Sequence, residues 1–228
     1  MNSTRKIAVI TGVVFIIATI TALLAAAVEP VLSGPDYLMK VSANVNQVAR
    51  GALFYLIAAF TSVGIAILMY PIMKGSNASL ALGSVVFRTI EAVMYMVAVV
   101  SLLSVLSLGQ NFTTAGNTDR AALQAIGDSL LSVREHATLA GVFAFSLGAF
   151  MYYYLFYQSR LIPRWLSGWG LVAIILMMTA CVLALFSNSP VTGYTLLILP
   201  IAVQEMVLAV WLIVKGFNVS AIASGAAK

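Results

Sequence analysis

Two acidic residues and one arginine lie inside otherwise apolar stretches of the sequence, where ionisable side chains are costly. Arg88 and Glu91 belong to the stretch from Ser79 to Leu108, and Glu205 belongs to the stretch from Tyr194 to Val214. A charged residue at such a depth costs ~2.5–3.5 kcal/mol on insertion scales, so it should face protein and find a partner. These three side chains are therefore the first candidates for a binding site.

Helical geometry predicts that the candidates share one face and one depth. At ~100° per residue, a ~60° sector of one helix contains four polar residues, Ser84, Arg88, Glu91 and Tyr95. A rise of ~1.5 Å per residue places Arg88 ~13 Å and Glu91 ~18 Å from one face of a ~30 Å apolar core. The same rise places Glu205 ~14 Å from that face. We expect one mid-membrane centre, in which Arg88 meets both carboxylates or one carboxylate is protonated.

Two interpretations of this centre are open. In the first, the charges form a neutralised pin that holds two helices together, with Gln204 assisting. In the second, Glu91 or Glu205 binds a proton or a small polar solute, because two acids against one base leave a spare negative charge. That charge must be protonated or matched by a cation, a ligand or Arg134.

Arg134, Glu135 and His136 form a second polar group at the start of another apolar stretch. Arg134 shares a helical face with residues that are mostly small or aromatic, namely Thr138, Gly141, Phe145, Gly148 and Tyr152. Small residues let a neighbouring helix approach closely, so this face should be buried, with Arg134 as the lid of a cavity above Glu91. His136 is rotated ~160° from that direction, and one histidine is a poor metal site. We expect an interfacial or solvated His136, and neither a metal nor a cofactor.

Composition identifies the chain as a membrane protein. Of its 228 residues, 62% are hydrophobic and 8% are charged, whereas a soluble domain carries ~25% charged residues. The net charge of +5 resides mainly in short loops between apolar stretches and does not indicate nucleic-acid binding. No polar run is long enough for a separate soluble domain, so we expect one integral membrane domain over residues 1–228, in contact with lipids.

Six apolar stretches are long enough to cross a ~30 Å hydrocarbon core as helices. We therefore expect an all-α fold with six transmembrane helices in one bundle, at about residues 7–28, 51–73, 79–108, 130–157, 165–186 and 194–214. The first stretch could also be a signal peptide, but its apolar run exceeds the usual ~7–15 residues, which favours a retained helix. Short helices are expected from Asp36 and from Thr118 to Ser129, the latter capped by Asn117 or Thr118.

The loop charges predict that both termini are cytoplasmic. With that orientation the inner side holds seven basic residues and no acidic ones: Arg5, Lys6, Lys74, Arg160, Arg164, Lys215 and Lys228. The outer side holds Lys40, Arg50 and Arg120 against Glu29, Asp36, Asp119 and Asp128. Such a bias follows the positive-inside rule. Aromatic residues near the inner boundary are expected to form a lipid-facing belt: Tyr70, Tyr152, Tyr153, Tyr154, Tyr157, Trp165, Trp169 and Trp211.

Four segments carry a family resemblance: PDYLMKVSANVNQVARGAL (Pro35–Leu53), LALGSVVFRTIEA (Leu80–Ala92), YQSRLIPRWLSGWGL (Tyr157–Leu171) and LPIAVQEMVLAVWLIVKGF (Leu199–Phe217). They resemble prokaryotic polytopic membrane proteins grouped as the domain of unknown function 4386 family. The charged positions of that family correspond to Arg88, Glu91, Arg134 and Glu205, and its inward turn corresponds to Arg160, Pro163, Arg164 and Trp165. The resemblance implies a multi-helix protein of a prokaryotic plasma membrane and brings no catalytic assignment.

The sequence thus predicts an integral membrane protein that binds or moves a small polar solute or a proton. The candidate residues are Arg88, Glu91, Glu205, Gln204, Tyr95 and Arg134. The alternative is a non-catalytic sensor, regulator or partner subunit whose buried charges only fix helix packing. An enzyme ranks third, because the sequence has no H-E-x-x-H, G-x-S-x-G or phosphate-loop motif.

Overall fold

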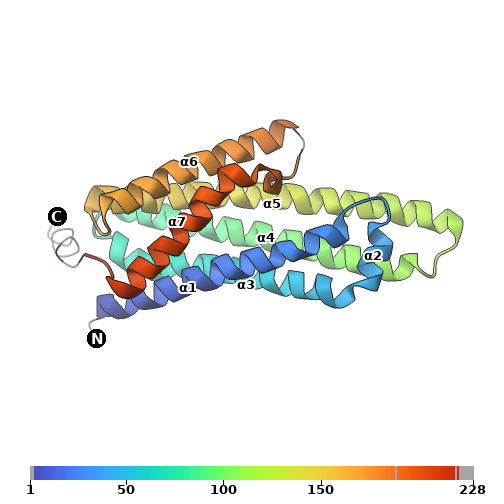
Figure 1. Ribbon diagram of the computed structural model, residues 1–228, viewed down its shortest axis with the longest axis horizontal. Helices are drawn as coiled ribbons and strands as arrows, with labels where there is room; N and C mark the ends of the chain where they lie inside the picture. The colour runs from blue at the N-terminus through green and yellow to red at the C-terminus, as the bar shows by residue number, and fades with distance from the viewer. Residues whose placement is uncertain (1–2, 188, 219, 221–228) are drawn as a thin grey trace.

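The computed structural model describes residues 3–187, 189–218 and 220, and it is helical (Figure 1). The long helices are α1 (Ser3–Ala25), α3 (Val45–Met73), α4 (Ala78–Phe112), α5 (Asn117–Ser159), α6 (Arg164–Ser187) and α7 (Thr195–Val214). Three short helices join them: η1 (Ala26–Leu32), α2 (Tyr37–Ala43) and η2 (Val191–Tyr194). No strand occurs in the described ranges, and six helices are long and apolar enough to cross a membrane, which confirms the predicted fold class.

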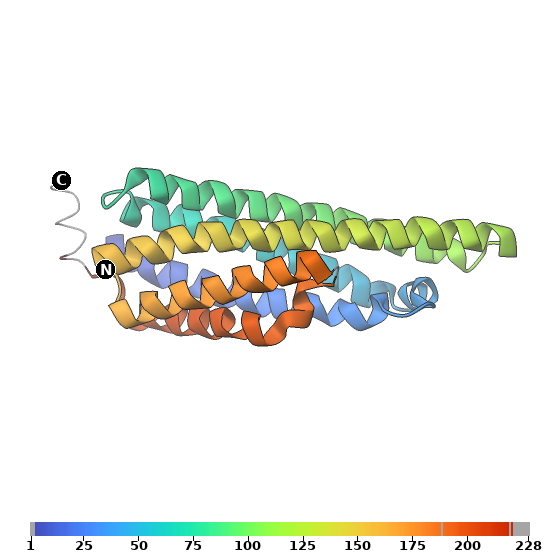
Figure 2. The same ribbon diagram turned by 90° about the horizontal axis from the view of Figure 1, so that it is seen from above.

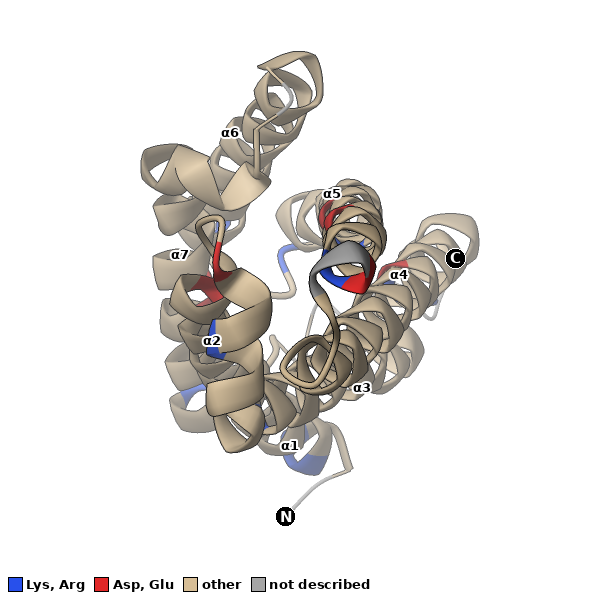
Figure 3. Ribbon diagram, turned by 90° about the vertical axis from the view of Figure 1, so that its right-hand side faces the viewer, with Lys and Arg blue, Asp and Glu red and all other residues tan. Residues whose placement is uncertain are grey.

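The six long helices form a closed ring in chain order. Each packs against the next, from α1 through α3, α4, α5 and α6 to α7, and α7 returns to α1. Short connections favour this arrangement because they make consecutive helices antiparallel neighbours. The end view of Figure 3 shows α4 and α7 on opposite sides of the ring, with α5 between them. The helices of Arg88 and Glu205, which were expected to meet at one centre, therefore face each other across the ring.

We call the end of the ring where α1 begins and α7 ends the N/C end, and the opposite end the far end. At the far end α4 and α5 project beyond the other helices (Figure 2). The 43 residues of α5 would be ~65 Å long, about twice a hydrocarbon core. The segment from Gly109 to Ser129, expected to be a loop with one helical section, is helical apart from residues 113–116. Gly116 precedes the first turn of α5, and the side chains of Asn117 and Thr118, expected to cap this helix, lie outside the described part of the structure.

The short helix expected from Asp36 is present as α2, and it packs against the projecting part of α4. The Tyr37 hydroxyl donates a hydrogen bond to Asp128 Oδ1 of α5 at 3.0 Å. Burial, together with this carboxylate, raises the pKa of Tyr37, so the hydroxyl keeps its proton and remains a donor. The α2 segment thereby joins α4 to α5 at the far end.

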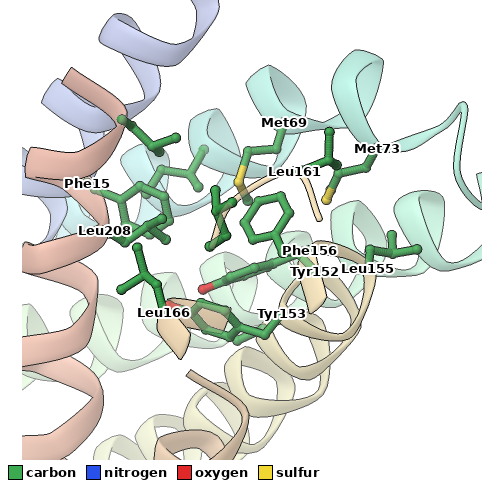
Figure 4. Close-up of a cluster of buried hydrophobic side chains, with 14 of the residues drawn as sticks. Phe15, Met69, Met73, Tyr152, Tyr153, Leu155, Phe156, Leu161, Leu166 and Leu208 are labelled. Atoms are coloured by element: carbon green, nitrogen blue, oxygen red, sulfur yellow. The ribbon is translucent and has the colours of Figure 1, made fainter. Parts of the chain in front are cut away.

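The ring interior towards the N/C end is filled by one hydrophobic cluster to which all six long helices contribute. Figure 4 shows its largest members, among them Phe15, Met69, Phe156 and Leu208. Tyr152 and Tyr153 of α5 lie in this cluster with no exposed surface, so their assignment to the lipid-facing belt is wrong. The reason is that α5 packs between α4 and α6 and turns both rings inward. Other belt residues are exposed as predicted: Tyr154, Tyr157 and Trp165.

The first helix is attached to the end of the last one by Arg5. Its Nη1 donates to the carbonyl of Leu212 at 3.0 Å, and its Nη2 donates to the carbonyls of Ile213 and Val214. The final carbonyls of a helix have no partner within the helix and carry partial negative charge. One guanidinium therefore satisfies three of them and complements the helix dipole. Lys228, expected on the same side as Arg5, lies outside the described residues.

This contact predicts that Arg5→Ala lowers the free energy of unfolding by about 2 kcal/mol, because charge-assisted hydrogen bonds are each worth about 1.5–3 kcal/mol and Arg5 is only half-buried. Thermal unfolding of the detergent-solubilised protein measures the loss. The matched control is Lys6→Ala, since Lys6 is an exposed neighbouring cation. Equal melting temperatures for the two variants would contradict a capping role for Arg5.

Candidate functional site: an ionisable centre inside the ring

Arg88 and Glu91 form an ion pair within α4, as their spacing of three residues allows. The Arg88 Nη1 donates to Glu91 Oε2 at 2.9 Å, and the Ser62 hydroxyl of α3 donates to the same oxygen at 2.6 Å. Arg88 is 3% exposed and Glu91 is 4% exposed. The predicted partnership of these two residues is therefore present, and it also ties α4 to α3.

The guanidinium of Arg88 lies against aromatic rings of α5. Its central carbon is 4.6 Å from the ring centre of Phe145 and 6.0 Å from that of Tyr152. Such contacts stabilise a cation that has left water. Gly148 makes them possible, because a Cβ atom there would lie 3.3 Å from Arg88 Cγ and 3.3 Å from the Ser84 carbonyl. The small-residue face of α5 is thus buried against α4, as predicted.

Glu205 approaches this centre from α7, but it does not pair with Arg88. Its Oε1 accepts a hydrogen bond from the Tyr152 hydroxyl at 3.4 Å, and the side chain is half-buried. Among the side chains that the structure describes, Glu205 takes part in no ion pair. The expected cluster of one guanidinium with two carboxylates is therefore not formed. Arg88 is paired with Glu91, and Tyr152 contacts both Arg88 and Glu205.

Gln204 belongs to a neighbouring hydrogen-bonded group that contains no charge. The Tyr153 hydroxyl donates to Gln204 Oε1, and Gln204 Nε2 donates to the Leu166 carbonyl at 3.0 Å. Figure 4 shows the Tyr152 and Tyr153 rings side by side, with the centres 4.4 Å apart. Gln204 is fully buried and joins α5, α6 and α7. Of the two adjacent polar residues on α7, Gln204 therefore fixes the helices, and Glu205 faces the charged centre.

Arg134 has a different partner from the one expected. It forms an ion pair with Glu29 of η1, and its Nη2 also donates to the Tyr55 hydroxyl at 3.2 Å. This pair joins α5 to the segment after α1 and to α3. Arg134, predicted to be the lid of a cavity, instead holds helices together at the far end of the ring. Glu135 and His136 are exposed, in agreement with the solvated or interfacial position predicted for His136.

Tyr95 lies between the two ion pairs. It follows Glu91 by one turn of α4, and its ring meets that of Tyr55 edge to face with centres 6.3 Å apart. Tyr55 in turn contacts Arg134. Polar and aromatic side chains therefore follow one another along the ring interior, from Glu205 through Tyr152, Arg88, Glu91, Tyr95, Tyr55 and Arg134 to Glu29.

Four members of this series were missed at the sequence level: Ser62, Tyr55, Glu29 and Tyr152. For Tyr152 a signal was present, because it shares the small-residue face of α5 with Arg134. Glu29 appeared to be an ordinary loop carboxylate, and nothing in its local sequence shows that it meets Arg134 of α5. Ser62 and Tyr55 lie on an apolar helix where single polar residues are common.

One family covers almost the entire chain. A family described as a domain of unknown function, DUF4386, matches residues 10–216, a range that includes every residue of the centre. No curated protein and no solved structure shows significant similarity to the chain. The match confirms the resemblance seen in the sequence, and the protein belongs to the DUF4386 family of unknown function.

Proposed function

We propose that this membrane protein binds a proton, or a small cationic solute in its place, at Glu205, and that the Tyr152 hydroxyl completes the site. We further propose that it lies in a prokaryotic plasma membrane with both termini in the cytoplasm. The charge distribution supports this orientation. The N/C end carries basic side chains (Arg5, Lys6, Lys74, Arg160, Arg164 and Lys215), and the acidic loop residues belong to the far end.

The observation that carries the proposal is the unequal pairing of the two mid-membrane carboxylates. Glu91 accepts hydrogen bonds from Arg88 and Ser62, at 2.9 and 2.6 Å. Within the described ranges, the only hydrogen bond of the Glu205 carboxylate is the long contact to the neutral Tyr152 hydroxyl, at 3.4 Å. An ionised carboxylate at this depth is costly unless a charge of opposite sign accompanies it. A proton or a cation supplies the missing charge.

The surroundings of Glu205 favour a proton or a very small cation over a larger solute. Tyr152 is fully buried and packs on Tyr153, so it leaves little space on the α5 side of the carboxylate. The Arg88 guanidinium lies 6.0 Å from the centre of the Tyr152 ring and repels a second cation placed near it. A proton binds directly to the carboxylate oxygen and needs no additional cavity.

We expect the stability of the wild-type protein to fall as the pH is raised across the range in which Glu205 releases its proton. The slope should reach about 1.4 kcal/mol per pH unit where the folded protein still holds the Glu205 proton and the unfolded chain has released it, and it returns to zero once the folded protein has also lost that proton. Glu205→Gln keeps the shape, removes the charge, and should be folded and free of this dependence. Thermal unfolding in detergent over a pH series measures both proteins.

Glu135→Gln is the matched control, since it removes an exposed carboxylate from α5. It should retain the wild-type pH profile. If Glu205→Gln also retains that profile, Glu205 is not the proton-binding group and the proposal fails.

The second candidate function is a non-catalytic membrane module in which the buried charges only fix helix packing. Two ion pairs favour it. The Arg88–Glu91 pair of α4 is linked to α3 through Ser62, and the Arg134–Glu29 pair joins α5 to η1 and, through Tyr55, to α3. On this view Glu205 is also structural, and Glu205→Gln should reduce yield and stability at every pH. The pH series above therefore separates the two functions.

The Arg88–Glu91 pair has a structural role in either case. Glu91→Gln should lower the free energy of unfolding by about 3–5 kcal/mol, because it leaves the Arg88 charge buried without a counter-ion. The double variant Arg88→Leu with Glu91→Leu should be less destabilised than Glu91→Gln, because no buried charge remains. Thermal unfolding of the two variants tests this order, and the reverse order would show that the pair is not what holds α4 in place.

A further inference from the structure

A basic pocket at the N/C end is separate from the ionisable centre. It has a volume of about 620 Å³ and lies between the turn from α5 to α6 and the segment that follows α7. Three cationic side chains line it: Arg160, Arg164 and Lys215. Its lining contains no aspartate or glutamate, and none of the three cations has an ion-pair partner within the described part of the chain. The pocket is therefore strongly attractive to an anion.

The backbone around the pocket is held in a fixed shape. Asn218 donates from its backbone N–H to the Leu161 carbonyl at 2.9 Å and from Nδ2 to the Arg160 carbonyl at 3.3 Å. These bonds join the segment after α7 to the turn between α5 and α6. The walls are thus tied together, whereas Arg160, Arg164 and Lys215 themselves are exposed and available.

Arg160 holds an unfavourable backbone conformation at this site. Its φ is 57°, and no other described residue apart from glycine has a positive φ. A left-handed conformation costs a non-glycine residue about 1–2 kcal/mol, and glycine avoids this cost. Arginine at this position places a cation at the rim of the pocket but strains the backbone. Backbone strain of this kind is typical of functional positions.

The level of the pocket relative to the membrane surface indicates which kind of anion it binds. Trp211 lines it, and Trp211 meets Trp165 edge to face with ring centres 6.4 Å apart. Tryptophan collects at the level of lipid headgroups, and Trp165 is 57% exposed on the outer surface of the ring. The first amide groups of α6, which begins at Arg164, add partial positive charge at the same level. The pocket thus opens where lipid phosphate groups lie.

We propose that this pocket binds the phosphate group of an anionic phospholipid from the leaflet at the N/C end. The guanidinium groups of Arg160 and Arg164 bind the phosphate oxygens, Lys215 adds a third positive charge, and Trp211 packs against the glycerol region. Arginine suits this role because its planar group forms paired hydrogen bonds with phosphate. Basic pockets between transmembrane helices bind anionic headgroups in this manner. The site is independent of Glu205 and of any proton bound there.

The test uses the full chain in mixed micelles of a neutral detergent with either phosphatidylglycerol or phosphatidylcholine. Tryptophan fluorescence and the melting temperature are followed as the lipid fraction rises. We expect phosphatidylglycerol to bind at least about fivefold more tightly than phosphatidylcholine. Arg160→Gly should reduce that preference about fivefold, as expected for one cation near a headgroup. Because glycine suits the left-handed position, this variant should melt no lower than the wild type in detergent alone.

Lys215→Gln should show the same loss of preference, and Lys74→Gln is the matched control. Lys74 lies at the same end, on the turn between α3 and α4, and does not line the pocket. If Lys74→Gln weakens phosphatidylglycerol binding as much as Arg160→Gly, the effect is general surface charge and the proposal is wrong. Inorganic phosphate is tested alone at millimolar concentration. Stabilisation by it equal to that by phosphatidylglycerol would assign the pocket to a free anion and overturn the lipid assignment.

Discussion

A charged side chain inside a bilayer must find its partner within the protein, and this requirement determines the interior of the ring. Arg88 pairs with Glu91 on its own helix, and a hydroxyl of α3 donates to the same carboxylate. Two aromatic rings of α5 pack against the guanidinium. Three adjacent helices thus meet around one guanidinium. Since lipid tails provide no hydrophobic drive for helices to associate, such polar and close-packed contacts carry much of the specificity of assembly.

The pairing also explains how the two ends of the ring differ. At the far end Arg134 and Glu29 join η1 to α5, and Tyr37 with Asp128 joins α2 to α5. At the N/C end the corresponding contact is Arg5, which binds three backbone carbonyls of α7 and no carboxylate. Arg160 and Arg164, at the turn between α5 and α6, form no ion pair with any residue that the structure describes. These cations are therefore free to meet a partner outside the chain. At the far end, by contrast, Glu29 is bound by Arg134 and Asp128 by Tyr37.

The sequence was sufficient to predict six helices, the buried ion pair of Arg88 with Glu91, and the inward face of α5. Those results follow from periodicity and from the cost of charge in lipid, which are local properties. The partners of Arg134 and Glu205 could not be predicted in this way, because they depend on which helices are neighbours. A depth estimate places Arg88 and Glu205 in the same layer, but it gives no information about their positions around the ring.

Tyr152 also shows that local sequence properties do not determine which way a side chain points. Its position near a membrane boundary favoured a lipid-facing role, and its place on the α5 face with Arg134 favoured burial. The second property decides, since the packing of α5 between α4 and α6 leaves that face no access to lipid. Local position indicates the depth of an aromatic residue, and only the packing of its helix determines which way it points.

The closed ring itself explains why, within the described part of the chain, Glu91 has an ion-pair partner and Glu205 does not. Six helices joined in chain order place the third and the sixth on opposite sides. Arg88 pairs with Glu91 on its own helix, and the hydroxyl of Tyr152 contacts Glu205. A tyrosine hydroxyl donates one hydrogen bond, and it adds no formal charge. The contact reduces the cost of burying the carboxylate without neutralising it. Among the described residues, Glu205 thus has no cation within ion-pairing distance, because Arg88 is paired with Glu91 on its own helix; the proton or cation proposed for this site would supply the missing positive charge.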